Sequence, residues 1–315
     1  QLAPCFSVLA RRMDHPKGHR PRAAQEPANA ILTSLGPRWE GLGLGRFGRP
    51  EEMTSILLTP RFRTSGHLVF LFLPRGKPEP VLVAKVPRLA GVSPSLEREV
   101  RNLRAVQARR AGGFDSIPRV VAFEQDRGRA ILVETALVGS PLSPRAVRRD
   151  PEASCLAVTG WLGDLHARAA ASEPARGSPA GTAPGHWFDR LVAQPLGGFA
   201  AGFPLSDDER RLLARTQDLA LPLRSMDLPL VVEHGDLSHP NLLRLASGGG
   251  LGVLDWELAE LEGLPAVDLF FFLGYAAIAR RRARTGEACV AALREAFHGR
   301  RAWARRYVLA YAERL

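Results

Sequence analysis

The first half of the chain alternates short apolar runs with turn-forming residues, which is the pattern of β-strands. His67–Leu73 is strongly apolar, and a polar turn separates it from a run that carries Lys85 near its end. The expected strands are Ser55–Thr59, His67–Leu73, Val81–Val86, Arg119–Glu124 and Ala130–Glu134. Short strands joined by turns predict an antiparallel sheet.

One helix interrupts these strands. Ser93 suits the N-cap position and Pro94 the first helical position. Apolar residues then recur at helical spacing, at Leu96, Val100, Leu103 and Val106. The first half of the chain is therefore predicted to be a small antiparallel sheet with a single helix.

The second half has mainly helical periodicity. Helices are expected at Glu152–Ala171, Asp207–Leu219, Ala266–Ala279, Glu287–Phe297 and Ala302–Leu315, and very short strands at Val231–Val232, Leu242–Leu245 and Leu251–Leu254. Strands give way to helices near Thr135–Ser140. The predicted fold class is α+β, with a sheet-rich lobe over residues 49–138 and a mostly helical lobe over residues 139–315. Residues 1–48 are rich in Arg, Pro and Gly, so we expect a loosely ordered extension with one short helix near Ala28–Leu35.

The formal net charge of +11 does not by itself predict a nucleic-acid-binding protein. Only three of the 43 Lys and Arg residues are lysine, and the arginines are spread along the chain rather than set in one stripe with aromatic residues between them. The densest run, Arg280–Arg284, is interpreted as the solvated end of a helix. No nucleic-acid partner is expected.

The apolar runs and the cysteines indicate a cytoplasmic protein without a membrane partner. The longest apolar run, near Val267–Ala279, is shorter than the roughly 20 residues that cross a bilayer. Cys5, Cys155 and Cys289 lie far apart and form no Cys-x-x-Cys pair, which gives a structural zinc site no support. Sparse, unpaired cysteines favour a reducing compartment.

The most specific chemistry lies between two of the short strands, in the segment from His234 to Asn241. It reads His-Gly-Asp-Leu-Ser-His-Pro-Asn, so Asp236 and Asn241 share one loop, and fourteen residues after Asn241 another strand is followed by Asp255. Phosphoryl transfer from Mg-ATP needs a carboxylate for the proton of the attacking hydroxyl group. It also needs carboxylate and amide oxygens that hold Mg²⁺ against the phosphates. This spacing therefore indicates phosphoryl transfer.

These segments resemble the aminoglycoside phosphotransferase and choline kinase group, the small-molecule branch of the protein-kinase-like fold. The resemblance covers roughly residues 54–280. Its motifs are His234-Gly235-Asp236 with Asn241, Asp255-Trp256-Glu257, Gly263–Leu269, Leu162–Ala167, and Arg98-Glu99 with Leu103. It implies a bilobal fold in which the sheet lobe binds the nucleotide, while the helical lobe carries the catalytic loop and the helices that bind the acceptor.

The resemblance implies roles for the residues of the catalytic loop. Asp236 would be the catalytic base, and Asn241 and Asp255 would ligate Mg²⁺. His234 either exchanges protons itself or, in the interpretation we favour, hydrogen-bonds the loop backbone and fixes Asp236. Asp268 is expected to hydrogen-bond the catalytic loop rather than a metal ion.

The resemblance also implies that Lys85 contacts the phosphates of ATP and pairs with Glu99. Glu97 is the alternative partner, but Glu99 lies beside the apolar face of the helix, and residues two apart on a helix face different directions. The plainer alternative for Lys85 is a surface lysine at the end of a strand. Glu257 either supports the metal site or faces the acceptor.

The nucleotide is expected to lie between two connecting segments. Thr59–Gly66 would cover the phosphates with backbone N–H groups, although it has one glycine and no GxGxxG pattern. We expect the contacts at Thr64, Ser65 and Gly66. The hinge Glu134–Leu137 should offer backbone groups to a purine, which leaves both ATP and GTP possible.

A small molecule with a hydroxyl group is the expected acceptor. Protein kinases carry an arginine before the catalytic aspartate, where this chain has Gly235. Only seven residues separate Asp255 from Gly263, which leaves no room for an activation segment. An aminoglycoside, a sugar or a related metabolite would fit. An aminoglycoside is a polycation and needs an acidic pocket, for which the candidates are Asp164, Glu257, Glu260 and Glu262.

Two other classes of protein are compatible with parts of the pattern. A metallohydrolase would use His234, Asp236, His239 and Asp255 as ligands, but it would leave Asn241 and Lys85 without a role. A non-catalytic, nucleotide-binding pseudokinase would usually lack the base, the lysine or the metal-binding aspartate, and this chain has all three.

Overall fold

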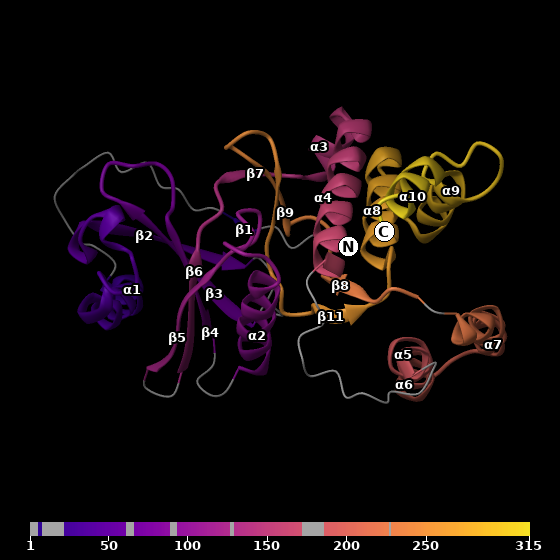
Figure 1. Cartoon of the computed structure of the whole chain (residues 1–315), viewed down its shortest axis with the longest axis horizontal. Helices are drawn as coiled ribbons and strands as arrows, with labels where there is room; N and C mark the ends of the chain where they lie inside the picture. The colour runs from indigo at the N-terminus through magenta and orange to yellow at the C-terminus, as the bar shows by residue number, and fades with distance from the viewer. Residues whose placement is uncertain are drawn as a thin grey trace.

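The computed structural model of the chain describes residues 6–7, 22–60, 66–88, 93–126, 129–171, 186–226 and 228–315. In its first half, six antiparallel strands form one sheet in the order β1-β2-β3-β4-β6-β5 (Figure 1). The strands are β1 (Phe6–Ser7), β2 (Met53–Pro60), β3 (His67–Pro74), β4 (Leu82–Pro87), β5 (Val120–Asp126) and β6 (Arg129–Thr135). The five strands predicted from the sequence correspond to β2 through β6.

One face of this sheet is covered by α2 (Pro94–Ala108), the single helix predicted between the strands. Leu96 and Val100 of α2 pack in a buried cluster with Leu132 of β6. Lys85 of β4 pairs with Leu132 in the antiparallel register. Directly opposed residues share one face of a sheet, so Lys85 also lies on the α2 side.

The opposite face is covered by α1 (Arg22–Leu35), which contains the short helix expected near Ala28–Leu35 (Figure 1). Side chains between Ala28 and Leu44 pack against the sheet, which differs from the loose order expected for residues 1–48. Ile31 and Trp39 belong to the same buried cluster as Phe70 of β3. Burial of a few large apolar side chains against the sheet outweighs the Arg, Pro and Gly content on which the expectation rested.

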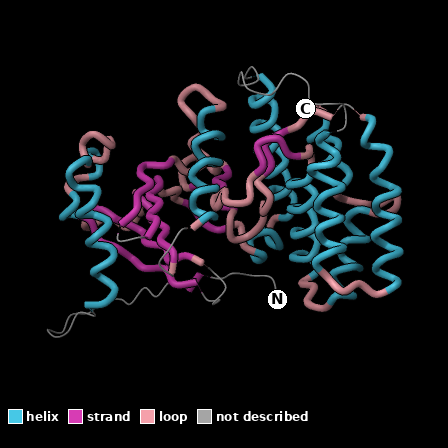
Figure 2. The backbone as a smooth tube through the Cα atoms, turned by 90° about the horizontal axis from the view of Figure 1, so that it is seen from below, coloured by secondary structure: helices cyan, strands magenta, loops and turns pink. Residues whose placement is uncertain are grey.

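The second half is mostly helical, as predicted. Its main helices are α3 (Pro144–Arg149), α4 (Pro151–Ala171), α8 (Val267–Arg281), α9 (Gly286–Phe297) and α10 (Arg305–Ala312). α4 and α8 lie side by side, with α10 against α4 and α9 against α8 (Figures 1 and 2). Leu162, Trp256, Phe272 and Tyr311 are fully buried among them and form the centre of the larger core.

Five very short strands complete the helical half. They are β7 (Gly139–Pro141), β8 (Val231–Glu233), β9 (Leu242–Leu245), β10 (Leu251–Val253) and β11 (Glu260–Gly263). β9 lies between β7 and β10, and β8 pairs with β11. The sequence predicted three of them, but β7 and β11 were missed because they have no alternation of apolar and polar residues. A Cβ atom on Gly139 would lie 2.4 Å from the Arg244 carbonyl oxygen, so glycine permits the close approach of β7 to β9.

Three helices stand apart from the helical core. The elements are α5 (His186–Phe188), α6 (Gln194–Gly202) and α7 (Asp207–Ala220), and they lie beyond β11, away from α4 and α8 (Figure 1). Arg190, between α5 and α6, donates to the Glu260 carboxylate at 3.0 Å and to the Glu262 carbonyl at 2.6 Å. These contacts tie the three helices to β11.

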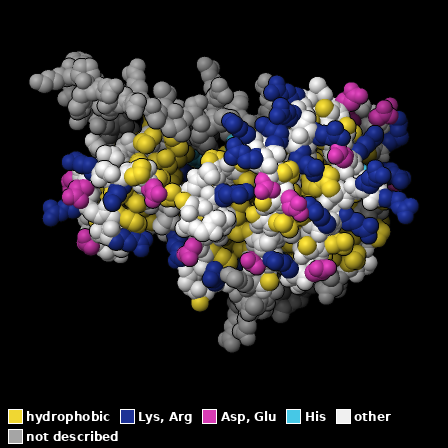
Figure 3. Space-filling view, turned by 90° about the horizontal axis from the view of Figure 1, so that it is seen from above, with side chains coloured by type: hydrophobic (Ala, Val, Ile, Leu, Met, Phe, Trp, Pro, Cys, Tyr) yellow, Lys and Arg dark blue, Asp and Glu magenta, His cyan; other side chains and the backbone are white. Residues whose placement is uncertain are grey.

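Basic side chains lie over much of the surface drawn in Figure 3, with acidic side chains between them. On that face the positive charge is therefore not gathered into one stripe. No helix in the described part of the chain combines the length and the hydropathy needed to span a bilayer.

Candidate active site

The loop between β8 and β9 carries Asp236 and Asn241, two of the residues predicted to perform the chemistry. Because β10 pairs antiparallel with β9, Asp255 emerges from the end of β10 beside this loop. The Leu254 N–H group donates to the Asn241 carbonyl at 2.9 Å and ties the two segments together. Asp255 has a φ of 66°, a left-handed conformation that is strained for a residue with a side chain and recurs at functional sites.

The Asp236 carboxylate is held by two side chains of its own loop. Ser238 Oγ donates to Oδ1 at 3.2 Å, and Asn241 Nδ2 donates to Oδ2 at 2.9 Å. Burial raises the pKa of Asp236, although these two hydrogen bonds oppose the shift. Asn241 Oδ1 has no partner among the described residues, so this amide fixes the carboxylate with one end and leaves its oxygen available for a cation.

Gly235 is required by the backbone of this loop. Its φ is +82°, and a Cβ atom there would lie 2.7 Å from the carbonyl oxygen of Leu258. Both the left-handed conformation and the close approach exclude a residue with a side chain. The arginine that protein kinases carry at this position therefore does not fit this loop.

Asp268, in the first turn of α8, and His234 brace the loop from behind. Asp268 accepts hydrogen bonds from the backbone N–H groups of His234, at 2.6 Å, and Gly235, at 3.0 Å. His234 Nε2 lies 2.8 Å from the Leu254 carbonyl, and Nδ1 lies 3.2 Å from the Asp236 N–H group. Burial lowers the pKa of His234 to about 4, so the ring is neutral, donates from Nε2 and accepts at Nδ1. Of the two interpretations of His234, the geometry therefore matches the one in which it fixes Asp236.

Lys85 lies among three carboxylates. Its Nζ forms an ion pair with Glu99 of α2, the predicted partner, and lies 3.6 Å from Glu134 and 3.8 Å from Asp255. Glu97 forms no ion pair with any residue in the described ranges. The Lys85 side chain is 12% exposed and the Glu99 side chain 1%, so Lys85 is not a surface lysine at a strand end.

The charges in this cluster do not balance. Burial raises the pKa of Glu134 to about 8, because the attraction of Lys85 offsets the loss of hydration only in part. Burial favours neutral Lys85, but Glu134, Glu99 and Asp255 outweigh that effect and raise the pKa of its ammonium group. One ammonium group faces three carboxylates, and a proton or a second cation would offset the remaining negative charge.

The segments expected to hold the nucleotide are described in part. Thr64 and Ser65 lie outside the described residues, and Gly66 is exposed at the start of β3. In the hinge, neither the N–H nor the C=O group of Leu137 has a hydrogen-bond partner in the described part of the chain. The Leu137 side chain lies against Gly252 of β10, where an added Cβ atom would be 3.2 Å from Leu137 Cδ1. The hinge thus offers free backbone groups beside β10.

The side chain of Glu134 is part of the site, and the sequence reasoning missed it. That reasoning gave Glu134 a place in the hinge through its backbone. In the structure, alternate residues of β6 place Glu134 on the same face as Leu132, which is paired with Lys85. The signal available in the sequence was the alternation of residues along the strand Ala130–Glu134, which places Leu132 and Glu134 on one face.

The arrangement fits Mg²⁺ better than a transition-metal hydrolase. Within the described residues, no three His, Cys, Asp or Glu side chains come together as a metal-binding group. Both ring nitrogens of His234 are bonded to the backbone, so it cannot serve as a ligand in this conformation. Mg²⁺ keeps several waters and usually takes one or two carboxylates besides substrate phosphates. Asp255, which is 45% exposed, and the free oxygen of Asn241 match that demand.

The acidic residues suggested for an acceptor pocket already have partners. Glu260 and Glu262 lie 3.0 Å and 3.9 Å from Arg190. Asp164 lies 3.4 Å from Arg314. A hydrogen bond from Ser95 at the start of α2 holds Glu257. Asp164, Glu260 and Glu262 therefore do not offer free charge to a polycation.

Comparison with known proteins places this geometry in a family. A model of the phosphotransferase enzyme family matches residues 69–309, a stretch that contains Lys85, the Asp236 loop, Asp255 and α8. No curated protein sequence matches the chain significantly.

Solved structures share the fold at low sequence identity. A candidate aminoglycoside phosphotransferase from Ralstonia eutropha JMP134 is 18% identical, with 91% of this chain and 79% of that chain covered and a TM-score of 0.56. The GDP complex of a mutant aminoglycoside 2′-phosphotransferase-IIIa is 15% identical, with 89% and 97% covered and a TM-score of 0.51. The bilobal, kinase-like fold expected from the sequence is thus shared with these proteins.

Proposed function

The chain belongs to the phosphotransferase enzyme family, and on that premise we propose that it moves the γ-phosphoryl group of Mg-ATP to a hydroxyl group of a small molecule. It is an enzyme of the small-molecule kinase class. The observation that carries the proposal is the convergence of Asp236, Asn241, Asp255 and Lys85 from three segments of the chain onto one site. Phosphoryl transfer requires a base, metal ligands and a cation for the phosphates, and these residues can supply all three.

Asp236 would accept the proton of the acceptor hydroxyl group. Ser238 and Asn241 fix its carboxylate, and the loop behind it is braced by Asp268, so the base is held in one orientation. Its raised pKa favours proton uptake during the transfer. His234 is neutral and bonded on both sides, which assigns it to positioning.

Asn241 Oδ1 and Asp255 would hold Mg²⁺, which when bound offsets the charge of the phosphates. Lys85 would meet the phosphates from β4, since the pair with Glu99 directs its ammonium group toward Asp255. The free backbone groups of Leu137 would receive the purine. ATP is the proposed donor. GTP remains a candidate because backbone groups accept either base and a structural relative binds GDP.

The acceptor would be a sugar, an aminoglycoside or a related metabolite with a free hydroxyl group. The helices α5 to α7 are tied to β11 through Arg190, and we propose that they cover such an acceptor. Glu260 and Glu262 already form ion pairs with Arg190. We therefore propose a neutral or weakly charged acceptor rather than a polycation.

An acceptor screen tests this function. The protein is incubated with Mg-ATP and with sugars, amino sugars and aminoglycosides, and the readouts are ADP release and a gain of one phosphoryl group in the acceptor mass. Asp236→Asn serves as the inactive control. The pseudokinase alternative predicts nucleotide binding with no acceptor-dependent ADP from any compound, and that outcome would contradict the proposal.

A further inference from the structure

His67, the first residue of β3, lies next to the proposed phosphate site without an assigned role. It directly follows Gly66, at the end of the segment expected to cover the phosphates. In the register of β3 and β4, His67 pairs with Pro87 and Val69 pairs with Lys85. Positions 67 and 69 point to the same face of the sheet, so the His67 ring lies on the Lys85 side, under α2.

Hydrogen bonds hold the ring of His67 by one edge only. Its Nε2 atom lies 3.1 Å from Ser93 Oγ and 3.1 Å from Ser95 Oγ, at the start of α2. The two serine hydroxyl groups also lie 3.3 Å from each other. The other ring nitrogen, Nδ1, has no partner in the described part of the chain.

The charges of two residues proposed to hold the nucleotide, Lys85 and Asp255, act on this ring. Burial lowers the pKa of His67 and the charge of Lys85 lowers it further, whereas the charge of Asp255 opposes the shift, so the ring is neutral. A neutral imidazole carries one proton, on the nitrogen that is not accepting a hydrogen bond. The hydroxyl group of Ser93 or of Ser95 can donate to Nε2, and the ring proton is then on Nδ1.

We propose that a serine hydroxyl group at the start of α2 donates to His67 Nε2, and that the His67 Nδ1–H group donates a hydrogen bond to an oxygen of the terminal phosphate of the bound nucleoside triphosphate. This inference rests on the proposed function. His67 is a phosphate-contacting residue in this arrangement, while Ser93 and Ser95 position it.

Two nucleotides that differ by one phosphoryl group test the assignment. Affinities of the full chain for Mg-ADP and for the Mg complex of β,γ-imido-ATP are measured by calorimetry, for wild type and His67→Ala. We expect His67→Ala to lower the affinity for β,γ-imido-ATP about 10-fold, which is the usual effect of losing a hydrogen bond to a charged group. The affinity for ADP should change by less than about twofold. His298→Ala, an exposed histidine after α9, is the matched control and should change neither.

A second pair of variants separates phosphate contact from a structural role. The amide nitrogen of asparagine can take the place of Nδ1, whereas that of glutamine takes the place of Nε2. His67→Asn should therefore retain more β,γ-imido-ATP affinity than His67→Gln. Equal loss of both nucleotides in His67→Ala, or equal behaviour of the asparagine and glutamine variants, overturns the inference while the proposed function stands. A wild-type protein that binds neither nucleotide overturns both.

Discussion

Glu134 Oε1 lies 3.6 Å from Lys85 Nζ, while Glu134 Oε2 is buried and has no hydrogen-bond partner in the described part of the chain. The shortest of the ion pairs that the Lys85 ammonium group forms is the one with Glu99. Glu134 is therefore an additional carboxylate in a site that is partly desolvated, and its ionisation costs stability.

The first prediction follows from this cost. The pKa of Glu134 rises from an ordinary value of 4.5 to about 8 in the folded protein. Between these two values the folded state keeps a proton that the unfolded state has lost, so this group lowers the free energy of unfolding as the pH rises from about 4.5 to about 8. Glu134→Gln removes the effect. The melting temperature of Glu134→Gln minus that of wild type should therefore increase across this range.

Thermal unfolding of both proteins at pH 5, 6.5 and 8 measures this difference. Glu97→Gln, which changes a glutamate on α2 outside the Lys85 cluster, is the control and should give a difference that does not vary with pH. A constant difference for Glu134→Gln as well would mean that Glu134 stays ionised in the folded protein.

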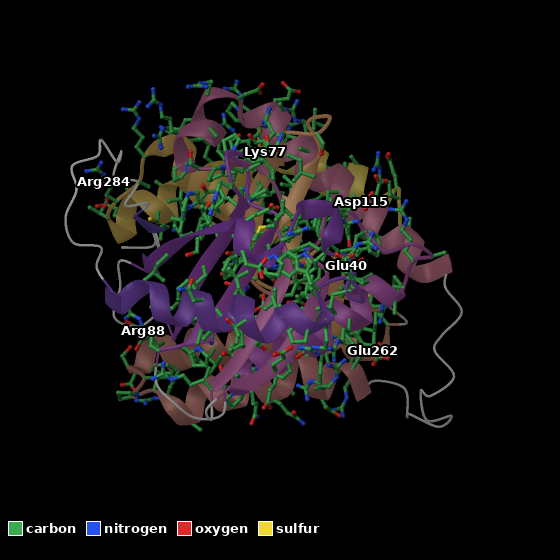
Figure 4. All side chains as sticks on the ribbon, turned by 90° about the vertical axis from the view of Figure 1, so that its left-hand side faces the viewer. Glu40, Lys77, Arg88, Asp115, Glu262 and Arg284 are labelled. Atoms are coloured by element: carbon green, nitrogen blue, oxygen red, sulfur yellow. The ribbon has the colours of Figure 1, made fainter. Side chains whose placement is uncertain are left out.

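The two lysines of the sheet lobe give the second prediction. Lys85→Ala should lower kcat/KM for Mg-ATP by about 100-fold, because it removes a charged contact with the phosphates and leaves Glu99 buried without its partner. Lys77 is exposed in the turn between β3 and β4, and Lys77→Ala should change kcat/KM by less than about twofold (Figure 4). Steady-state kinetics with varied Mg-ATP decides between them, and similar losses in both variants would contradict the nucleotide site.

The third prediction concerns the backbone of the catalytic loop. Gly235 and Gly299 have nearly the same φ, +82° and +83°, but only at Gly235 would a Cβ atom meet a neighbouring backbone group. Both alanine variants carry the conformational penalty of about 1 kcal/mol. Gly235→Ala adds a clash with the Leu258 carbonyl, so it should lose about 1–3 kcal/mol more of unfolding free energy than Gly299→Ala. Denaturant unfolding measures the free energy of unfolding of both variants. Equal losses would show that the loop around Gly235 rearranges to accept the Cβ atom without an energetic penalty.

Periodicity in the sequence predicts the main strands of this structure, whereas the spacing of polar residues predicts the candidate site. β2 through β6 were predictable because each combines an apolar run with flanking turns. The closeness of Asp236, Asn241 and Asp255 was predictable because their spacing is typical of one kind of chemistry. β7 and β11 were not predictable, because pairing with neighbours rather than their own composition makes them strands. The side-chain roles of Glu134 and His67 depend on strand register, which the hydrophobic pattern alone leaves open.

The last prediction separates the two central carboxylates. Asp236 is bonded to Ser238 and Asn241 within its own loop, whereas Asp255 faces Lys85 from the end of β10. If Asp236 is the base, Asp236→Asn should leave Mg-nucleotide affinity nearly intact and lower turnover by about 100- to 10,000-fold, the usual worth of general-base catalysis. If Asp255 holds Mg²⁺, Asp255→Asn should weaken Mg-nucleotide binding itself, because the metal offsets the charge of the phosphates.

Magnesium dependence distinguishes these roles from a general loss of structure. Calorimetry at two Mg²⁺ concentrations, beside turnover with the acceptor found in the screen, supplies both measurements. Higher Mg²⁺ should partly restore Asp255→Asn, since mass action compensates for a weakened ligand set, and should not restore Asp236→Asn, whose defect is in proton transfer. The opposite pattern would exchange the two roles. Full activity in both variants would contradict phosphoryl transfer at this site, because no other described carboxylate lies on the loop between β8 and β9.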